Sequence, residues 1–390
     1  MITRDSNFYD IMALGLADAA NLQEFVDVMF AEKYNAPQTD GFLWDDNIQL
    51  DFSYEQLAAE LGVYAMATFV DLSSPGGTHS VEGATISSGK IPRFKHGFVM
   101  DEKTIREQMI LAQRFGAVTP QMQSQLSKIM FNSIDKLIGG NYNTLTYQRH
   151  QAISTGAFAL TSTNNPGGIQ NLTFDFGIPA TNKSFCGGTF GTRGTGYVWT
   201  DPTNAANPIG DLQDMVQYAE DNMMPVGHFE MSKAAWNHFK AHYNVKKQVA
   251  LYVNMNADVS NVANFLVTES MIKSFLVDAA LPPIKVIDSL VIADKYDAAT
   301  RAMVYTQIRP FDENKVCLVP DGQLGTIKAV EPIVLQDPAA RVAMYDGGRT
   351  VLTQTFDSKN KIQYIESELT ALVVPSVSRY ILILSINATS

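Results

Sequence analysis

The sequence has little cysteine, no basic clusters and no long apolar runs, and each shortage excludes a class of protein. Cys186 and Cys317 are the only cysteines in 390 residues, and neither belongs to a paired-cysteine metal or redox motif. This usage fits a reduced intracellular compartment and implies no disulfide framework. No basic run is longer than Lys246-Lys247, and the formal net charge is -11. A surface built to bind nucleic acid or an anionic membrane needs clustered Lys and Arg, so this balance argues against one.

The longest apolar runs fall well short of the ~20 residues that a membrane-spanning helix needs. The N-terminal stretch places Asp5 and Asp10 ahead of its short apolar run, unlike the basic-then-apolar order of a signal peptide. We therefore expect a soluble protein that is not secreted. With 46% hydrophobic and 18% charged residues, the chain can bury a large core and would ordinarily divide into two or three subdomains.

The strongest helical pattern runs from Thr119 to Gly156. Thr119 can serve as an N-cap, Pro120 suits the first helical position, and Gly156 readily adopts the left-handed conformation at a helix C-terminus. The adjacent Gly139 and Gly140 predict a bend or short break, because each costs about 1 kcal/mol against alanine in a helix interior. One broad apolar arc contains Met122, Leu126, Ile129, Met130, Ile134, Leu137 and Ile138. Its width indicates protein on two sides of the helix, although two ordinary packed helices of an unrelated domain remain an alternative.

Residues 1 to 62 are predicted to form an arm that lies on something else. Amphipathic helical patterns cover Asp5 to Phe30 and Tyr54 to Leu61. From Val63 to Val99 the pattern predicts two β segments joined by a tip rich in Gly, Ser and Pro. Because two isolated strands are marginally stable in water, this hairpin must lie against a neighbour, in the same chain or in another.

The rest of the chain mixes helical and strand patterns. A short helix is expected at Asp101 to Phe115, and β segments with turns follow Gly156. Further helices are predicted at Asp211 to Asn222 and Ser232 to His242. The clearest strands are VIDSLVIAD, AMVYTQIR, KVCLVPD and the apolar run of the C-terminal segment ALVVPSVSRYILILSIN.

Two candidate ligand motifs are weak. His238 and His242 would share one helix face, but Phe239 stands where the metalloprotease pattern needs a glutamate. The glycine-rich stretch Gly187 to Gly196 has neither the phosphate-loop ending nor the dinucleotide spacing, so turn chemistry explains it better.

Catalytic motifs are also lacking. The adjacent Asp45 and Asp46 would point to opposite faces of a strand, so they are expected to be solvated rather than paired for acid/base chemistry. No nucleophile elbow occurs, and neither cysteine has a histidine nearby in sequence. We predict no catalytic residue, no cofactor-binding residue and no metal site.

Several ordered blocks of this sequence resemble the major capsid protein E family of tailed bacteriophages. From about Tyr64 to the C-terminus these blocks are IPRFKHGFVMDEKTIREQ, TLTYQRHQAISTGAFAL, NLTFDFG followed by YVWTDPTNAANPIGDLQDM, FEMSKAAWNHF, RPFDENKVCLVPDGQLGTIKAVEP, DPAARVAMYDGGRTVLTQTF and VVPSVSRYILILSIN. Each block is short, and their order and spacing carry the resemblance. Residues 1 to 50 match less well.

The resemblance implies an α+β protein with the Hong Kong 97 capsid fold. It implies an N-terminal arm (1–62), an extended loop (63–103) and a peripheral domain (104–205 and 337–372) built around a spine helix at about 119–155. An axial domain (206–336 and 373–390) completes the subunit. The broad apolar face of the long helix and the unburied hairpin both suit this architecture.

The resemblance further implies a structural shell protein without enzymatic activity. It would assemble as pentamers and hexamers into an icosahedral virion head around double-stranded DNA, with no sequence-specific DNA contacts and no membrane. Assembly would take place in the host cytoplasm with scaffold and portal proteins, and in some heads with decoration proteins. The intersubunit contact is expected at the tip of the extended loop, Ser73 to Lys90, through Pro75, Gly76, Gly77, His79, Glu82 and Lys90.

Two explanations of the net charge and two alternative functions stay open at this point. The acidic balance suits a wall over which packed DNA must slide, but it would equally serve solubility. A cellular nanocompartment shell of the encapsulin type, which encloses an enzyme cargo, has the same fold. An unrelated enzyme whose site forms only in three dimensions would show a deep pocket with convergent titratable groups.

Overall fold

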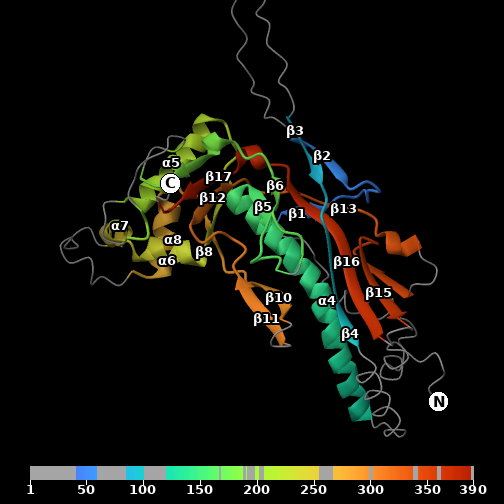
Figure 1. Cartoon of the computed structure of the whole chain (residues 1–390). Helices are drawn as coiled ribbons and strands as arrows, with labels where there is room; N and C mark the ends of the chain where they lie inside the picture. The colour runs from blue at the N-terminus through green and yellow to red at the C-terminus, as the bar shows by residue number, and fades with distance from the viewer. Residues whose placement is uncertain are drawn as a thin grey trace, which may run out of the picture. The chain divides into compact units, whose positions relative to one another are not determined.

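A computed structural model describes residues 41–58, 85–100, 120–166, 168–187, 190, 198–201, 206–253, 267–297, 302–336, 341–357 and 362–387 (Figure 1). The patterns predicted at Asp5 to Phe30 and Asp101 to Phe115 lie outside these residues. The chain divides into two units that alternate along the sequence. Unit 1 contains Met1–Tyr54, Lys90–Thr146 and Ile327–Val373, and unit 2 contains Glu55–Gly89, Tyr147–Thr326 and Val374–Ser390.

Unit 1 is built on a six-stranded sheet centred on the long strand β16 (Ile362–Pro375). The strand order is β1-β13-β16-β15-β14, and β4 also pairs with β16. The other strands are β1 (Phe42–Trp44), β4 (Arg93–Met100), β13 (Gly325–Ala329), β14 (Arg341–Tyr345) and β15 (Thr350–Asp357). Residues from Ser367 to Pro375 of β16 are all buried, which agrees with the apolar run LTALVVP and with a strand covered on both faces.

Helix α4 (Pro120–Thr155) is the long helix that the sequence predicts, and it spans 36 residues, about 54 Å at 1.5 Å per residue. It ends at Gly156, whose φ of +76° is the left-handed conformation expected there. Leu137 and Ile138 of the predicted apolar arc are buried, with exposed fractions of 2% and 0%. For the other residues of the arc, Met122 to Ile134, the structure describes the helix but not the burial of the side chains.

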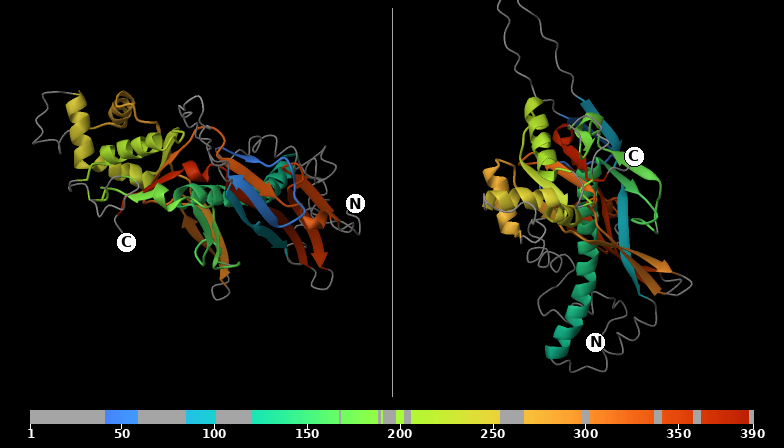
Figure 2. Two further views of the ribbon diagram at one scale, coloured as in Figure 1. Left: turned by 90° about the horizontal axis from the view of Figure 1, so that it is seen from above. Right: turned by 90° about the vertical axis from the view of Figure 1, so that its left-hand side faces the viewer.

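The break expected at Gly139-Gly140 is wrong, because α4 is continuous through both glycines (Figures 1 and 2). Gly140 allows β4 to approach the helix closely. A Cβ at Gly140 would lie 2.3 Å from Cε1 of His96, and Nε2 of His96 lies 2.7 Å from the backbone oxygen of Leu137. The missing side chain therefore makes room for an imidazole ring, and the contact offsets the low helix propensity.

Unit 2 contains a five-stranded mixed sheet in the order β7-β17-β12-β8-β9. Its strands are β7 (Lys183–Phe185), β8 (His228–Ser232), β9 (Ile284–Ile287), β12 (Lys315–Val319) and β17 (Leu382–Ser385). The β12 pairings with β8 and β17 are antiparallel, whereas β8 with β9 and β17 with β7 are parallel. The predicted C-terminal apolar run is thus a buried strand of this sheet.

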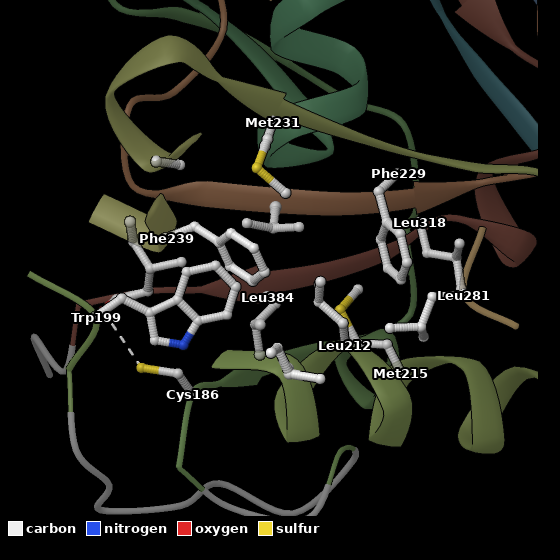
Figure 3. Packing of buried hydrophobic residues seen from close by; sticks show 14 of the residues in the cluster. Cys186, Trp199, Leu212, Met215, Phe229, Met231, Phe239, Leu281, Leu318 and Leu384 are labelled. Atoms are coloured by element: carbon white, nitrogen blue, oxygen red, sulfur yellow. Dashed lines mark hydrogen bonds between the residues drawn. The ribbon is translucent and has the colours of Figure 1, made fainter. Parts of the chain in front are cut away.

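Four helices contribute to the hydrophobic core of unit 2 together with this sheet: α5 (Pro208–Asp221), α6 (Lys233–Ala241), α7 (Tyr243–Val253) and α8 (Glu269–Asp278). Figure 3 shows part of the core, in which Trp199 lies against Phe239 with a ring-centroid distance of 5.6 Å. Phe229 and Met231 alternate along β8 and both enter this core, as a period of two predicts. The Ser232 hydroxyl caps α6 by accepting a hydrogen bond from the amide of Ala235 at 2.9 Å.

Three two-stranded ladders complete the described strands. They are β2 (Ser53–Ala58) with β3 (Thr85–Lys90), β5 (Ala157–Leu160) with β6 (Leu172–Asp175), and β10 (Val291–Asp297) with β11 (Ala302–Ile308). Short 3-10 turns occur at Ala180–Asn182, Ile333–Gln336 and Ser378–Tyr380.

The α+β class is confirmed, and two local expectations need correction. Tyr54 to Ala58 form part of a strand rather than the start of a helix, because pairing with β3 overrides a short amphipathic pattern. The segment VIDSLVIAD is two strands, β9 and β10, separated by Asp288 to Leu290. Among the described helices, none combines the length and apolarity needed to cross a bilayer.

Candidate functional site

Of the six residues predicted to contact a neighbouring subunit, only Lys90 is among the residues that the structure describes. Pro75, Gly76, Gly77, His79 and Glu82 lie outside the described residues. Lys90 is the last residue of β3 and is exposed, so it lies at the root of the predicted hairpin rather than at its tip.

The return of this hairpin is bound within the same chain. Strand β4 pairs with β16 over eight antiparallel positions, from Arg93 opposite Thr370 to Met100 opposite Gln363. Nη2 of Arg93 lies 2.5 Å from Oε2 of Glu368. Between β3 and β4, the amide of Ile91 donates to the carbonyl of Phe52, the residue before β2, at 2.7 Å. The hairpin was expected to lie against its own chain or another one. For the IPRFKHGFV segment, the neighbour is strand β16 of the same chain.

A group of charged side chains in unit 2 surrounds Glu230, at the centre of strand β8. We call Arg149, His228, Glu230, Lys285 and Asp321 the ionic cluster. Glu230 and Arg149 are buried, with exposed side-chain fractions of 0% and 2%. The alternation of β8 explains the position of Glu230, because its neighbours Phe229 and Met231 point into the helical core and Glu230 must point to the opposite face.

Three cationic groups converge on one oxygen of this carboxylate. Oε1 of Glu230 lies 2.7 Å from Nη2 of Arg149, 3.4 Å from Nζ of Lys285 and 3.5 Å from Nε2 of His228. Lys285 reaches it because β9 runs parallel to β8 with Lys285 opposite Glu230. The other ring nitrogen of His228, Nδ1, lies 3.0 Å from Oδ1 of Asp321. An isolated buried carboxylate would be very costly, so these partners make the charge tolerable.

The pKa shifts in the ionic cluster follow from these contacts. Burial works to raise the pKa of Glu230, but His228, Arg149 and Lys285 outweigh it and hold that pKa at about 2. The hydrogen bond with Glu230, helped by Asp321, raises the pKa of His228 against the opposing effects of burial and Lys285. The cluster therefore favours a charged glutamate and a protonated histidine, which stabilise each other.

Chemically, the ionic cluster is suited to holding elements together. Arg149 comes from α4 and Glu230 from β8, so their ion pair fixes the last turns of the helix to the sheet within unit 2. His150 extends the link, with Nε2 lying 3.1 Å from the hydroxyl of Ser289. Cys317, the buried thiol opposite Glu230 in the β8–β12 register, has a pKa raised well above its usual value by burial and is no activated nucleophile.

Unit 1 also contains a buried polar group, and unlike the ionic cluster of unit 2 it carries no formal charge. We call Asn141, Tyr345 and Ser367 the neutral cluster. Nδ2 of Asn141 lies 2.7 Å from both hydroxyl oxygens, and those two oxygens lie 2.8 Å apart. Burial raises the pKa of Tyr345, so its hydroxyl stays protonated over the whole ordinary pH range. This triangle links α4 to β14 and β16.

Asp45 was expected to be solvated, and that expectation is wrong. Its Oδ2 lies 3.0 Å from Nζ of Lys328, and its pKa is lowered because this partner, with Asn47 and Arg349, outweighs partial burial. Asp46 is exposed, as expected.

The two histidines of the weak metal motif do not share a helix face. His238 lies within α6, whereas His242 follows the end of that helix in an extended conformation. No group of metal-binding side chains occurs among the described residues. Most of the glycine-rich stretch after Gly187 lies outside them.

A family model described as phage major capsid protein E matches residues 34–384 of this chain. No curated protein matches it. Among solved structures, the capsid asymmetric unit of cyanophage A-1(L) is similar at 12% identity, with a TM-score of 0.42, 90% of this chain and 94% of that chain covered.

Two further solved structures show similarity of the same order. A phage-related protein from Bordetella bronchiseptica RB50 has 12% identity and a TM-score of 0.42, with 92% of this chain and 96% of that chain covered. A procapsid of satellite phage P4 that includes the size determination protein has 10% identity and a TM-score of 0.39, with coverages of 93% and 98%.

Proposed function

Because this chain belongs to the phage major capsid protein E family, we propose that it assembles as pentamers and hexamers into an icosahedral phage head that encloses double-stranded DNA. The observation that carries the proposal is the match of the family model over residues 34–384, most of the 390-residue chain. The family description names a phage shell protein, and it favours this role over a cellular nanocompartment shell or an enzyme.

The subunit acts in this proposal as a building block and not as a catalyst. Its buried charges support that role, because Oε1 of Glu230 is paired with three cationic groups of its own unit and no activated nucleophile accompanies it among the described residues. The net charge of -11 supports a wall that repels phosphates, so that packed DNA moves over it without sequence-specific contacts.

The proposed domain organisation keeps the boundaries inferred from sequence. An arm (1–62) and an extended loop (63–103) precede a peripheral domain (104–205 and 337–372) and an axial domain (206–336 and 373–390). Support comes from the composition of unit 1, in which the late segment Ile327–Val373 joins the early segment Lys90–Thr146. The tip residues Pro75, Gly76, Gly77, His79 and Glu82, together with Lys90, are proposed to contact an adjacent subunit.

Scaffold and portal proteins are the further partners in this proposal, with decoration proteins in some heads, and assembly occurs in the host cytoplasm. The first experiment purifies the expressed chain with and without a scaffold and measures its mass by size-exclusion chromatography with light scattering. Electron microscopy then shows whether closed shells form, and nucleic-acid staining of particles from infected cells shows what they contain. A chain that stays monomeric at every concentration and with scaffold contradicts the proposal.

A second experiment tests the extended loop. Deleting Pro75 to Ala84, which leaves strand β3 (Thr85–Lys90) in place, should leave the melting temperature of the subunit unchanged and should prevent or weaken shell closure, because small polar tip residues bury little apolar surface to offset about 1 to 2 kcal/mol of backbone entropy per ordered residue. The matched control replaces the same residues by a Gly/Ser sequence of equal length, which separates loss of contacts from shortening of the loop. Normal shells from both variants would exclude a bridging role.

A further inference from the structure

The hairpin formed by β10 and β11 has no role in the proposal above. Each strand has seven residues, and within the described part of the chain the two strands pair only with each other. Figure 1 shows this hairpin (orange) extending away from the five-stranded sheet of unit 2. We call it the β10–β11 ribbon.

The root of the ribbon makes polar contacts within unit 2. Just before β10, Oδ1 of Asp288 lies 2.7 Å from Nη1 of Arg309, which directly follows β11. The other oxygen of Asp288 lies 2.5 Å from Nζ of Lys233. Nε2 of Gln151 donates to the carbonyl of Pro310 at 2.6 Å. These contacts join both ends of the ribbon to neighbouring elements of unit 2.

Beyond this base the ribbon exposes large apolar side chains. Their exposed fractions are 56% for Ile292, 49% for Val304 and 67% for Tyr305, with 47% for Leu290 at the root. Ile292 lies opposite Gln307 and Tyr305 lies opposite Asp294, so Ile292 and Tyr305 are diagonal neighbours on one face. Val304 lies on the other face. Single exposed apolar residues are ordinary, but several on one two-stranded ribbon make it a candidate interaction surface.

We infer that the β10–β11 ribbon is a contact surface for a second copy of this chain. The inference rests on the proposed function, since a shell supplies neighbouring copies. Charge selects the occupant. Two copies that each carry a net charge of -11 repel each other over most of their surface, whereas the two strands contain only Asp294, Lys295 and Asp297, a formal charge of -1. A nearly neutral apolar ribbon is where like-charged copies approach at least cost.

The same charge count disfavours DNA as the occupant. A phosphate backbone needs clustered cations, and the two strands contain one lysine against two aspartates. A second copy can bury Ile292 and Tyr305 and can also pair with edge backbone groups of the ribbon, which no other described strand pairs with. The ribbon is therefore a second contact, separate in sequence from the extended loop.

A cysteine-protection experiment tests this contact. Tyr305→Cys places a thiol on the ribbon, while both natural cysteines are buried and unreactive, with burial raising the pKa of Cys186 to about 12. We expect a maleimide to label position 305 rapidly in free subunits and roughly tenfold more slowly in assembled particles, because a buried thiol reacts only after local opening. Equal labelling rates in both states would overturn the inference.

A pair of polar variants tests the energetic importance of the ribbon. Tyr305→Ser with Ile292→Ser should keep the melting temperature of the subunit and raise the concentration needed for assembly severalfold. The matched control is Ile169→Ser, which changes an apolar residue of 68% exposure elsewhere in unit 2. An equal effect of the control, or none of the ribbon variant, overturns the inference. Absence of particles from the wild-type chain would overturn the proposed function as well, whereas wild-type particles with an unprotected position 305 would overturn only the ribbon contact.

Discussion

The ionic cluster of unit 2 and the neutral cluster of unit 1 solve the same problem with different chemistry. Each attaches a part of α4 to strands, Arg149 in one case and Asn141 in the other, and each is buried. The neutral cluster joins the amide nitrogen of Asn141 and two hydroxyl groups with hydrogen bonds of 2.7 to 2.8 Å. The ionic cluster must also compensate for removing full charges from water.

This difference predicts different sensitivities. Neutral hydrogen bonds contribute about 1 kcal/mol each and do not respond to ordinary pH changes. An ion pair in a buried site gives little net stability compared with apolar residues, but removal of one partner is severe because the other charge stays buried. A larger loss of stability on mutation therefore need not indicate a larger net contribution of the intact group to stability.

The largest effect is expected from Arg149→Met. The variant leaves Glu230 without its shortest ionic contact and should lower the free energy of unfolding by about 3 to 5 kcal/mol, measured by urea titration. The double variant Arg149→Met with Glu230→Leu removes both charges and should recover much of the loss. A single variant within 1 kcal/mol of wild type would show that Lys285 and His228 suffice.

The second prediction uses pH to separate the clusters. The pKa of Glu230 is lowered from 4.5 to about 2, so its stabilisation is complete above pH 4.5 and is lost as the pH falls toward 2, about 3 kcal/mol in all. The pKa of His228 is raised above 6.5, so its stabilisation is complete below pH 6.5 and is lost as the pH rises through the raised value.

Unfolding curves from pH 3 to 9 should therefore show stability falling at both ends. Glu230→Gln should flatten the acid side and His228→Gln the alkaline side, whereas a variant of the neutral cluster should keep the wild-type profile. Identical pH profiles for wild type and Glu230→Gln would contradict the lowered pKa of Glu230.

A smaller effect is expected from Tyr345→Phe in the neutral cluster. The change deletes the hydroxyl that accepts from Asn141 and should cost about 1 to 3 kcal/mol, because a buried amide loses a partner. Ser367→Ala is the matched control, since it removes the other hydroxyl of the same triangle. If Tyr345→Phe shifts the acid side of the pH profile, the cluster is not electrostatically neutral.

The smallest effect is expected at the surface. Lys95 and Glu366 lie 2.7 Å apart on β4 and β16, but their side chains are 38% and 29% exposed, so Lys95→Ala should cost less than about 1 kcal/mol. The comparison with Arg149→Met then isolates burial as the cause of the larger loss. A loss near that of Arg149→Met would mean that β4 depends on this pair.

Sequence patterns predicted the parts of the fold that local chemistry decides. Pro120 and Gly156 marked the ends of α4, and the apolar C-terminal run marked β17. Long-range pairing decided the rest. Nothing local to Tyr54 reveals the partner strand that makes it β, and nothing local to Glu230 reveals Arg149, 81 positions earlier. The available signal for Glu230 was a charged residue between two apolar ones in FEMS, a pattern also typical of a half-exposed strand.

The predicted site residues illustrate a further limit. Lys90 was placed at the tip of a hairpin, since polar runs show no register, and it lies at the end of β3. Asp45 was expected in water because it and the adjacent Asp46 would point to opposite faces of a strand, whereas its partner Lys328 is distant in sequence. The tip residues from Pro75 to Glu82 stay predictions.

The fit of His96 against Gly140 has a consequence for the order of folding. Because two glycines interrupt its local preference, α4 owes its continuity to β4, which supplies the imidazole beside Leu137. A synthetic peptide covering Pro120 to Thr155 should therefore show two separate helical stretches in its chemical shifts, joined by an unwound pair at 139 and 140. In the whole chain we expect the two stretches to become one helix when β4 docks, so that the longest element of the protein is completed late and by a strand.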